Sequence, residues 1–270
     1  MKLKFTHCLL AGGVFLAACN DNDAPVEDND DNAIPAPITL TFQVVNQFPH
    51  DTTAFTEGFS FYNGQLYEST GAPEEPANSG TWVATVDLAK GTYDKKLNFG
   101  KAFFGEGITF FNDKMYQLTY KDQKGFVYDA KTFKKLREFT YKSEGWGFTN
   151  DGNHLIMSDG TSNIYYLTPD SLSFVKMLPV QDHNGYVGSI NELEYINGYL
   201  YANKWLSNEI LKIDPQTGYV VGKFDLSKQV ADAKNKYPGA QEMNGIAHDS
   251  TTGKTYITGK KWPVIYEIKW

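Results

Sequence analysis

Residues 59–67, Phe-Ser-Phe-Tyr-Asn-Gly-Gln-Leu-Tyr, decide the fold of this chain. Aromatic and aliphatic side chains lie on both sides of the dipeptide Asn63-Gly64 and alternate with polar ones. Asn and Gly tolerate the positive φ angles that both central residues of a tight hairpin turn require. The stretch therefore predicts a β-hairpin.

The same pattern of aromatic strand, tight turn and aromatic strand occurs five times. The five turns are Asn63-Gly64, Asn112-Asp113, Asp151-Gly152, Asn197-Gly198 and Thr252-Gly253. The first four hairpins are each followed by a further strand that ends in a second turn signal, at Val86-Asp87, Tyr128-Asp129, Leu167-Thr168 and Ile213-Asp214. One unit thus holds about four strands in roughly 40–55 residues, the size of a propeller blade. We predict an all-β fold, a five-bladed β-propeller; a β-sandwich with a second small domain is the alternative.

The two ends of the repeat region predict how the ring closes. The fifth unit stops after three strands at Ile265–Ile268, and one strand, Thr39–Phe48, precedes the first unit. We expect this N-terminal strand to join the last blade, because an edge would otherwise stay unpaired. One helix is expected, at Leu226–Lys236. The propeller is predicted to span residues 38–270.

The N-terminal segment has a different pattern, which resembles that of bacterial lipoproteins. Lys2 and Lys4 precede an apolar run at residues 9–18 that is too short to span a bilayer. Leu16-Ala17-Ala18-Cys19 resembles a lipobox, which predicts a signal peptide at 1–18 and a lipidated Cys19; an ordinary secretory signal is the alternative. Residues 19–37 are acidic and contain proline, which is typical of a flexible tether. We expect a lipid-anchored protein of the bacterial cell envelope, facing either the periplasm or the outside.

Composition excludes several classes of function. The 270-residue chain has a net charge of −7. The composition therefore does not favour a nucleic-acid-binding protein, which needs a basic surface. Cleavage before Cys19 removes Cys8 and leaves no free thiol, which excludes disulfides, thiol catalysis and Cys-based metal sites. No His residues stand at metal-ligand spacing, and Ser158-Asp159-Gly160 has no partner His for a catalytic triad. No phosphate-binding glycine loop precedes a helix.

Residues that differ between the repeats gather at one end of the hairpins. The residues seven positions before the second residue of each turn are Glu57, Glu106, Gly145 (next to Trp146) and Asn191. In the last unit, Asn244 stands nine positions before that residue. The residues seven positions after the second turn residue are Gly71, Tyr120, Asp159, Trp205 and Lys260. The start of one strand and the end of its antiparallel partner lie at the same end, so both sets should surround one mouth of the channel. A scaffold that repeats while these residues differ favours a functional site; the polar rim of a solvent-filled channel is the alternative.

A series of longer motifs runs in order through residues 55–262. The motifs are Phe55–Gly58, Leu66–Gly71, Phe104–Thr109, Tyr116–Thr119, Glu144–Gly147, Leu155–Gly160, Asn191–Tyr195, Asn244–Ala247 and Thr258–Pro263. With these motifs the chain resembles the plant-type glutaminyl-peptide cyclotransferases, a family also found in bacteria. The resemblance implies a five-bladed propeller that converts the N-terminal Gln of peptides or proteins into pyroglutamate and releases ammonia, without a catalytic zinc.

The resemblance implies catalytic roles for three residues. Glu106, which stands between two glycines, matches the proton shuttle that takes a proton from the attacking α-amine and gives it to the departing nitrogen. Asn191 and Lys260 match site positions that can donate to the amide oxygen as it gains charge, and the Trp146 indole N–H is a third candidate donor.

The remaining mouth residues are expected to bind substrate. Phe55, Phe104, Trp146 and Trp205 would form the wall of the pocket; ordinary core packing is the alternative for each. Two more depart from the plant pattern. Tyr120 stands where Trp is expected, and Glu57 stands where Gln is expected. We expect Glu57 either to bind the substrate amine or to raise the pKa of Glu106 by repulsion.

No cofactor is expected for catalysis, and we expect a monomer; a structural ion such as calcium in the channel stays open. Two other functions also stay open. One is a non-catalytic propeller that binds N-terminal peptides or glycans at the same mouth. The other is a sugar- or lactone-acting hydrolase with a central metal held by Glu57, Asn191 and Asn244.

Overall fold

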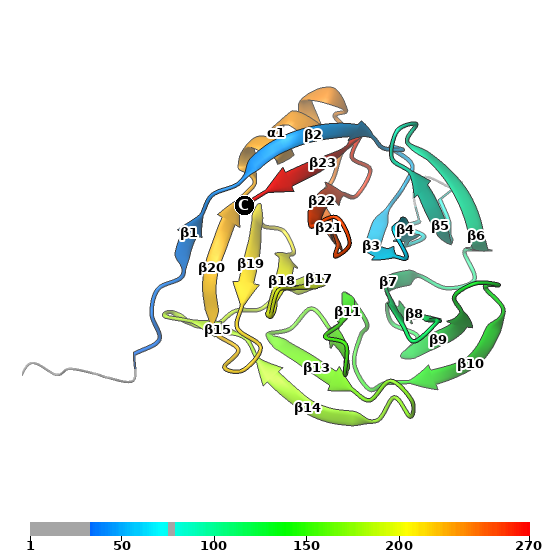
Figure 1. Ribbon diagram of the computed structural model, residues 1–270, viewed down its shortest axis with the longest axis horizontal. Coiled ribbons are helices and arrows are strands. Elements are labelled where there is room, and N and C mark those ends of the chain that lie inside the picture. The colour runs from blue at the N-terminus through cyan, green and yellow to red at the C-terminus, as the bar shows by residue number, and fades with distance from the viewer. Residues whose placement is uncertain (1–32, 75–78) are drawn as a thin grey trace, which may run out of the picture. The chain divides into compact units, whose positions relative to one another are not determined.

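A computed structural model describes residues 33–74 and 79–270, with a compact unit at Ile34–Trp270. In this unit the strands form five sheets arranged radially around a central channel (Figure 1). The predicted five-bladed β-propeller is therefore confirmed. The predicted leader, Cys19 and the tether up to residue 32 lie outside the described residues. Within the described ranges, no helix has the length and apolar character needed to cross a membrane.

Blades 1 to 3 are antiparallel sheets whose strands follow chain order from the channel outward. Blade 1 comprises β3 (Thr56–Tyr62), β4 (Gln65–Thr70), β5 (Thr81–Asp87) and β6 (Thr92–Gly100). Blade 2 comprises β7 (Gly105–Phe111), β8 (Lys114–Thr119), β9 (Lys124–Asp129) and β10 (Lys135–Thr140). Blade 3 comprises β11 (Phe148–Asn150), β12 (Leu155–Ser158), β13 (Asn163–Leu167) and β14 (Phe174–Pro179).

Blades 4 and 5 each take a strand from the N-terminal side. Blade 4 comprises β17 (Ile190–Ile196), β18 (Tyr199–Lys204), β19 (Glu209–Ile213) and β20 (Val220–Asp225), and β1 (Ile38–Leu40) lies parallel to β20. Blade 5 comprises β21 (Met243–Asp249), β22 (Lys254–Gly259) and β23 (Val264–Lys269), with β2 (Gln43–Pro49) as its antiparallel fourth strand.

The predicted ring closure is confirmed for β2, but the single strand predicted at Thr39–Phe48 is wrong. The chain leaves the edge of blade 4 after Leu40 and joins blade 5 at Gln43. It therefore covers the outer edges of two neighbouring blades, which one straight strand in one sheet cannot do.

Two short elements connect the last blades. A small hairpin of β15 (Gln181–Asp182) and β16 (Gly185–Tyr186) links blades 3 and 4. The helix α1 (Ser227–Lys236) links blades 4 and 5 and begins one residue later than predicted. It buries Val230 and Ala233 in the apolar core shared by these two blades.

The hairpin turns follow the sequence pattern in three blades and depart from it in two. Both central residues have positive φ at Asn63-Gly64, Asn112-Asp113 and Asn197-Gly198. At Asp151-Gly152 and Thr252-Gly253 only the glycine does, and these loops contain two more residues. In blade 5 the turn glycine, Gly253, is the fourth loop residue rather than the second, which explains why Asn244 stands nine, rather than seven, positions before it.

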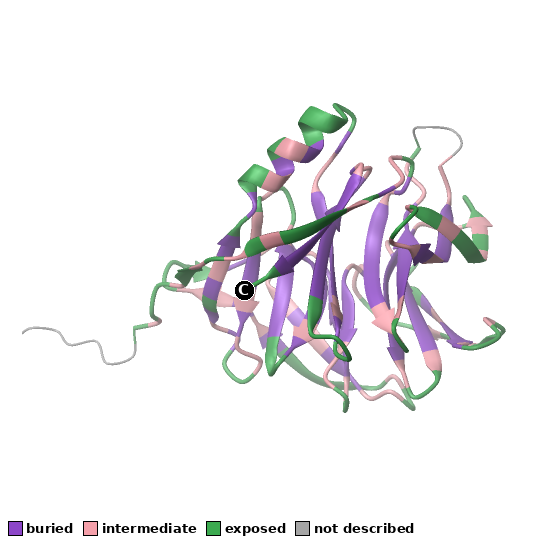
Figure 2. Ribbon diagram, turned by 45° about the horizontal axis from the view of Figure 1, so that its top comes forward, coloured by how far each residue is buried: buried purple, intermediate pink, exposed green. Residues whose placement is uncertain are grey.

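Each junction between neighbouring blades has its own apolar cluster among the described residues. Figure 2 shows the consequence: the inner strands are buried, whereas the outer strand β2 and much of α1 are exposed. The inner hairpins are thus held rigidly by neighbours on both sides, which gives their channel-facing residues fixed positions.

A buried ionic network fastens blade 5 to blade 1, where the ring closes. Glu68 accepts hydrogen bonds from the Thr56 hydroxyl at 2.7 Å, the Tyr93 hydroxyl at 2.8 Å and His50 Nε2 at 3.1 Å. His50 Nδ1 lies 2.7 Å from the Trp262 carbonyl oxygen. Burial lowers the pKa of His50, but the charge and hydrogen bond of Glu68 outweigh burial and raise it above its ordinary value. We therefore assign a charged imidazolium to His50, with both ring N–H groups donating.

The Glu68→Gln variant should lose about 3–5 kcal/mol of unfolding free energy, because removing one partner leaves the other charge buried and unpaired. Urea unfolding of the purified domain measures this loss. The control is Glu138→Gln, which removes the acid of the exposed Lys135–Glu138 pair and should leave the unfolding midpoint unchanged. Equal midpoints for wild type and Glu68→Gln would contradict a role for the network in closing the ring.

Candidate active site

A β-bulge places the site residue of four blades at the channel mouth. The pairing register shifts once near the start of β3, β7, β17 and β21. Each bulge contains one residue of the predicted mouth: Glu57, Glu106, Asn191 and Asn244. Because a bulge locally disrupts the ladder and re-aims a side chain, these four can project toward the mouth although they lie in buried inner strands.

Glycines that follow the two glutamates let the inner strands of neighbouring blades approach closely. A Cβ atom on Gly58 would lie 2.7 Å from the Ile108 backbone nitrogen in blade 2, and one on Gly107 would lie 2.6 Å from the Trp146 carbonyl oxygen, just before blade 3. Only glycine fits at both places without a shift of the backbone. The approach of blades 1 and 2 at Gly58 brings Glu57 close to Glu106.

The strand ends meet at one mouth, as the sequence predicts. The Tyr120 N–H donates to the Phe104 carbonyl oxygen at 3.0 Å, and the Lys260 N–H donates to that of Glu242 at 2.9 Å. The Gly71 N–H makes the equivalent bond to Phe55 at 2.9 Å.

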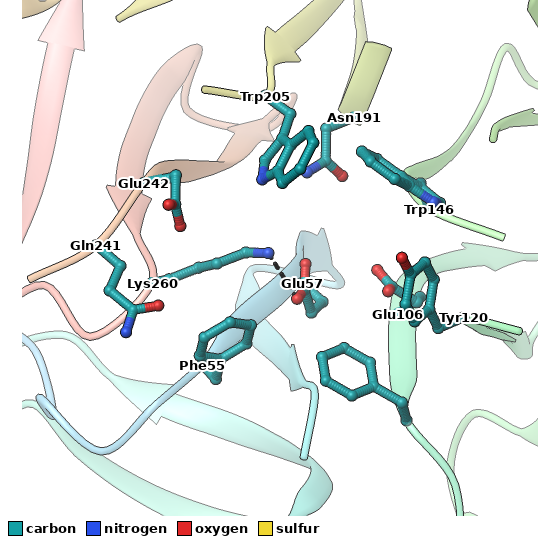
Figure 3. Close-up of a pocket in the computed structure, with 11 residues that line it drawn as sticks. Phe55, Glu57, Glu106, Tyr120, Trp146, Asn191, Trp205, Gln241, Glu242 and Lys260 are labelled. Atoms are coloured by element: carbon teal, nitrogen blue, oxygen red, sulfur yellow. Dashed lines mark ion pairs between the residues drawn. The ribbon is translucent and has the colours of Figure 1, made fainter. Parts of the chain in front are cut away.

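All nine predicted catalytic and substrate-binding residues line a single cavity of about 300 Å³ (Figure 3). They are Phe55, Glu57, Phe104, Glu106, Tyr120, Trp146, Asn191, Trp205 and Lys260. This volume is at the lower end for ligand pockets, so it suits one side chain and its backbone.

Two lining residues, Gln241 and Glu242, were missed. Glu242 stands two positions before Asn244, as Phe55 stands before Glu57. The repeat spacing could therefore have identified it. Asp159 does not line the cavity, because its carboxylate accepts hydrogen bonds from the Thr161 and Tyr165 hydroxyls within blade 3.

An arc of aromatic rings forms one side of the cavity. Successive ring centroids are 6.0 Å apart for Phe55 and Phe104, 5.7 Å for Phe104 and Tyr120, 6.2 Å for Tyr120 and Trp146, and 5.5 Å for Trp146 and Trp205. Three of these four contacts are edge-to-face, a favourable geometry for aromatic pairs. The arc supplies a preformed apolar wall.

A buried ion pair occupies the opposite side. Lys260 Nζ lies 2.7 Å from Glu57 Oε1 and 4.6 Å from the centroid of the Phe55 ring. Asn244 Nδ2 donates to Glu57 Oε2 at 3.0 Å. Figure 3 shows Glu57 between Lys260 and Glu106. Burial lowers the pKa of Lys260, but the charges of Glu57 and Glu106 raise it overall, so the ammonium stays charged.

The two carboxyl groups have different proton affinities. Burial raises the pKa of Glu106 well above its ordinary value, and the charge and hydrogen bond of Glu57 raise it further, against the effect of Lys260. Burial also raises the pKa of Glu57, to about 7, while Lys260 limits the rise. At a pH between the two pKa values the pair therefore holds one proton, mainly on Glu106.

The hydrogen-bond donors at the mouth are not equivalent. The Trp146 indole N–H already donates to Glu144 Oε2 at 3.0 Å, so we assign Trp146 to the wall rather than to the amide oxygen. The Asn191 side chain is 2% exposed, and its Oδ1 has no hydrogen-bond partner among the described residues. This oxygen is thus available to accept a hydrogen bond from a ligand.

No group of three or more His, Cys, Asp or Glu side chains in residues 33–74 and 79–270 is arranged to hold a metal ion. Glu192 and Glu194 of β17 are instead engaged by neighbouring inner strands. They accept the backbone N–H groups of Ile246 and His248 at 2.9 and 2.8 Å. The channel ion that the sequence left open has no acidic ligand set here.

Comparisons with known proteins identify the family of this chain. The family described as glutamine cyclotransferase matches residues 15–270. A glutaminyl-peptide cyclotransferase of Arabidopsis thaliana is 36% identical over 230 residues, which cover 84% of this chain and 70% of the plant protein. The chain therefore belongs to the glutamine cyclotransferase family.

Solved structures show the same architecture. The crystal structure of Myxococcus xanthus glutaminyl cyclase superposes with a TM-score of 0.78 at 31% identity, covering 86% of this chain and 97% of that one. A chain of a nidogen–laminin complex superposes with a TM-score of 0.50 at 13% identity, covering 77% of this chain and 73% of that one. The latter shows likeness of fold only.

The Gly71→Ala variant should disturb the aromatic arc without unfolding the chain. The added Cβ would lie 2.2 Å from the Phe104 ring, so that ring must move. We expect kcat/KM for a Gln-initiated peptide to fall on the order of 10-fold, because small displacements of positioning groups are costly. The control is Gly188→Ala, whose Cβ would meet no atom within 4 Å. Unchanged kcat/KM in Gly71→Ala would contradict a positioning role for the arc.

Proposed function

We propose that this protein cyclises the N-terminal glutamine of peptides and proteins to pyroglutamate, with Glu106 as the proton shuttle. The observation that carries the proposal is the convergence of Glu106, Asn191 and Lys260 on one small cavity with an aromatic wall. The reaction is that of the family: the α-amine attacks its own side-chain amide carbon, and ammonia leaves.

The raised pKa of Glu106 suits it to the second half of the reaction. An amide nitrogen leaves as ammonia only after it gains a proton, and a carboxyl group that is protonated near neutral pH can supply that proton. The amine proton released in the attack then restores the protonated state. Over one turnover the shuttle neither gains nor loses a proton.

Asn191 and Lys260 are assigned to the amide oxygen. Negative charge develops on this oxygen as the amine attacks, and preorganised donors stabilise it. The Asn191 amide can donate to it directly. An ammonium has three N–H donors, of which Lys260 uses one on Glu57, so another can reach the oxygen.

The aromatic arc is assigned to substrate folding. A five-membered ring closes only when the side chain bends back toward its own amine. Phe55, Phe104 and Trp205 line the cavity. The methylene groups of such a bent side chain can pack on these three rings. Close packing also excludes water, which could otherwise attack the amide carbon.

We further propose that catalysis needs no zinc, because proton transfer by Glu106 and donation by Asn191 and Lys260 account for each step. Rates measured with and without a chelator should be equal. A loss of activity on chelation, restored by zinc, would contradict this part of the proposal.

In Glu106→Gln, kcat should fall about 10²–10⁴-fold, the range for loss of a general acid–base group. Turnover of a Gln-initiated peptide is followed by ammonia release and by the corresponding loss of mass. Peptide binding, measured by calorimetry, should persist because the shape of the cavity is kept. Failure of correctly folded wild type to turn over any such peptide would contradict the proposed function itself, and peptide binding without turnover would favour a non-catalytic binding propeller.

We also propose that the chain is a monomeric lipoprotein of the bacterial cell envelope, anchored through Cys19. The support is the lipobox-like Leu16–Cys19 and the acidic segment that follows it. Expressed in a bacterium with labelled palmitate, the full chain should incorporate label and Cys19→Ala should not. Equal labelling of both would contradict anchoring at Cys19.

A further inference from the structure

A protonated Glu106 leaves the first proton transfer without an acceptor. The attacking nitrogen must lose a proton as it becomes the lactam nitrogen, and a neutral carboxyl group cannot take it. Two other carboxyl groups line the cavity among the described residues, those of Glu57 and Glu242. Only Glu57 is hydrogen-bonded to Glu106.

We propose that Glu57 is a second catalytic residue, whose carboxylate takes the proton from the attacking amine while the Glu106 carboxyl group gives its proton to the departing nitrogen. This inference rests on the proposed function and divides between two residues the work first assigned to one. It also distinguishes this chain from the plant-type pattern, in which Gln is expected at this position.

The contacts of Glu57 favour its ionised form. Each of its two oxygens has a donor: Lys260 Nζ at 2.7 Å on Oε1 and Asn244 Nδ2 at 3.0 Å on Oε2. Glu106 has no ion pair within 4.0 Å in the part of the chain that the structure describes. The single proton of the pair therefore resides on Glu106, which leaves Glu57 as the base.

The position of Glu57 matches this role. It lies in the bulge of β3, and Glu106 lies in the equivalent bulge of the neighbouring β7. The two carboxyl groups are 2% and 4% exposed and line the same cavity. A glutamine bent for ring closure holds its amine and its side-chain amide close together, so neighbouring carboxyl groups can reach one nitrogen each.

The step balances in atoms and charge. The bond from the amine nitrogen to the amide carbon forms, and the bond from that carbon to the departing nitrogen breaks. One proton moves from the amine nitrogen to Glu57, and one moves from Glu106 to the departing nitrogen, which leaves as ammonia. The proton on Glu57 then returns to Glu106 through the hydrogen bond between the two carboxyl groups, and the starting state is restored.

The test is the pH dependence of kcat in wild type, Glu57→Gln and Glu242→Gln. Wild type works with Glu57 ionised and Glu106 protonated, so kcat should fall on both sides of an optimum; its acid limb should lie near pH 7, set by the pKa of Glu57. In Glu57→Gln, Glu106 loses a neighbouring negative charge and must act alone from its ionised form. We expect kcat to fall about 10²-fold and the alkaline limb to disappear.

Glu242→Gln is the matched control, since it removes a carboxylate from the same cavity that is not hydrogen-bonded to Glu106. Its profile should keep both limbs, with the acid limb moved to lower pH because the charge of Glu242 raises the pKa of Glu57. An unchanged kcat and a two-limbed profile in Glu57→Gln would overturn the inference. The proposed function would still hold after that outcome in Glu57→Gln, provided that wild type turns over peptide and Glu106→Gln does not.

A readout that does not use Glu57→Gln covers the case in which that variant fails to fold. Infrared difference spectra follow protonated carboxyl groups across the pH range. Because burial also raises the pKa of Glu192 and Glu194, the Glu106 band is identified as the one present in wild type and missing in Glu106→Gln. We expect this band to persist above the acid limb and to be lost only along the alkaline limb. Ionisation of Glu106 at the pH of maximal kcat would overturn the inference.

Discussion

The buried contact between His50 and Glu68 is the constraint on which the closed ring depends. His50 directly follows the strand that completes blade 5, and Glu68 lies in blade 1. The same network reaches the active site, because Thr56 donates to Glu68 at 2.7 Å and stands beside Glu57. The Lys261 N–H also donates across this junction to the Ala54 carbonyl oxygen at 2.7 Å. Closing the ring and setting the distance between Lys260 and Glu57 are therefore one structural event.

The chemistry of the mouth follows from how a repeated scaffold is locally broken. A β-bulge in each of four inner strands turns a polar side chain out of the ladder. The glycine at 58 lets the strands that carry Glu57 and Glu106 approach closely. Two buried carboxyl groups beside one ammonium hold a single proton at a pH between their two pKa values, because a second negative charge would be uncompensated. Backbone geometry thus sets the protonation state that the reaction needs.

Local patterns predicted most of the fold, because Asn-Gly turns and alternating aromatic residues act over a few positions. They could not predict the division of the N-terminal strand, which depends on the edges of two blades that are distant in sequence. Most mouth residues were predictable since they stand at the same distance from the turns in several blades, and the two-residue offset between Phe55 and Glu57 would have identified Glu242 beside Asn244. The pairing of Lys260 with Glu57 was not predictable, because the two are brought together only when the ring closes. The sequence also left the Trp146 indole N–H as a candidate donor to the substrate amide oxygen. In the structure this N–H donates instead to Glu144, two positions away.

The central claim is that a glutamine side chain bends back within this cavity so that its amine lies at Glu57 and its amide nitrogen at Glu106. A crystal structure of the Glu106→Gln variant with a bound Gln-initiated peptide tests it most directly. We expect the α-amine within hydrogen-bond distance of Glu57, the side-chain amide nitrogen beside residue 106, and the amide oxygen facing Asn191 or Lys260. A peptide whose N-terminal side chain points away from residue 106, or lies outside the aromatic arc, would contradict it.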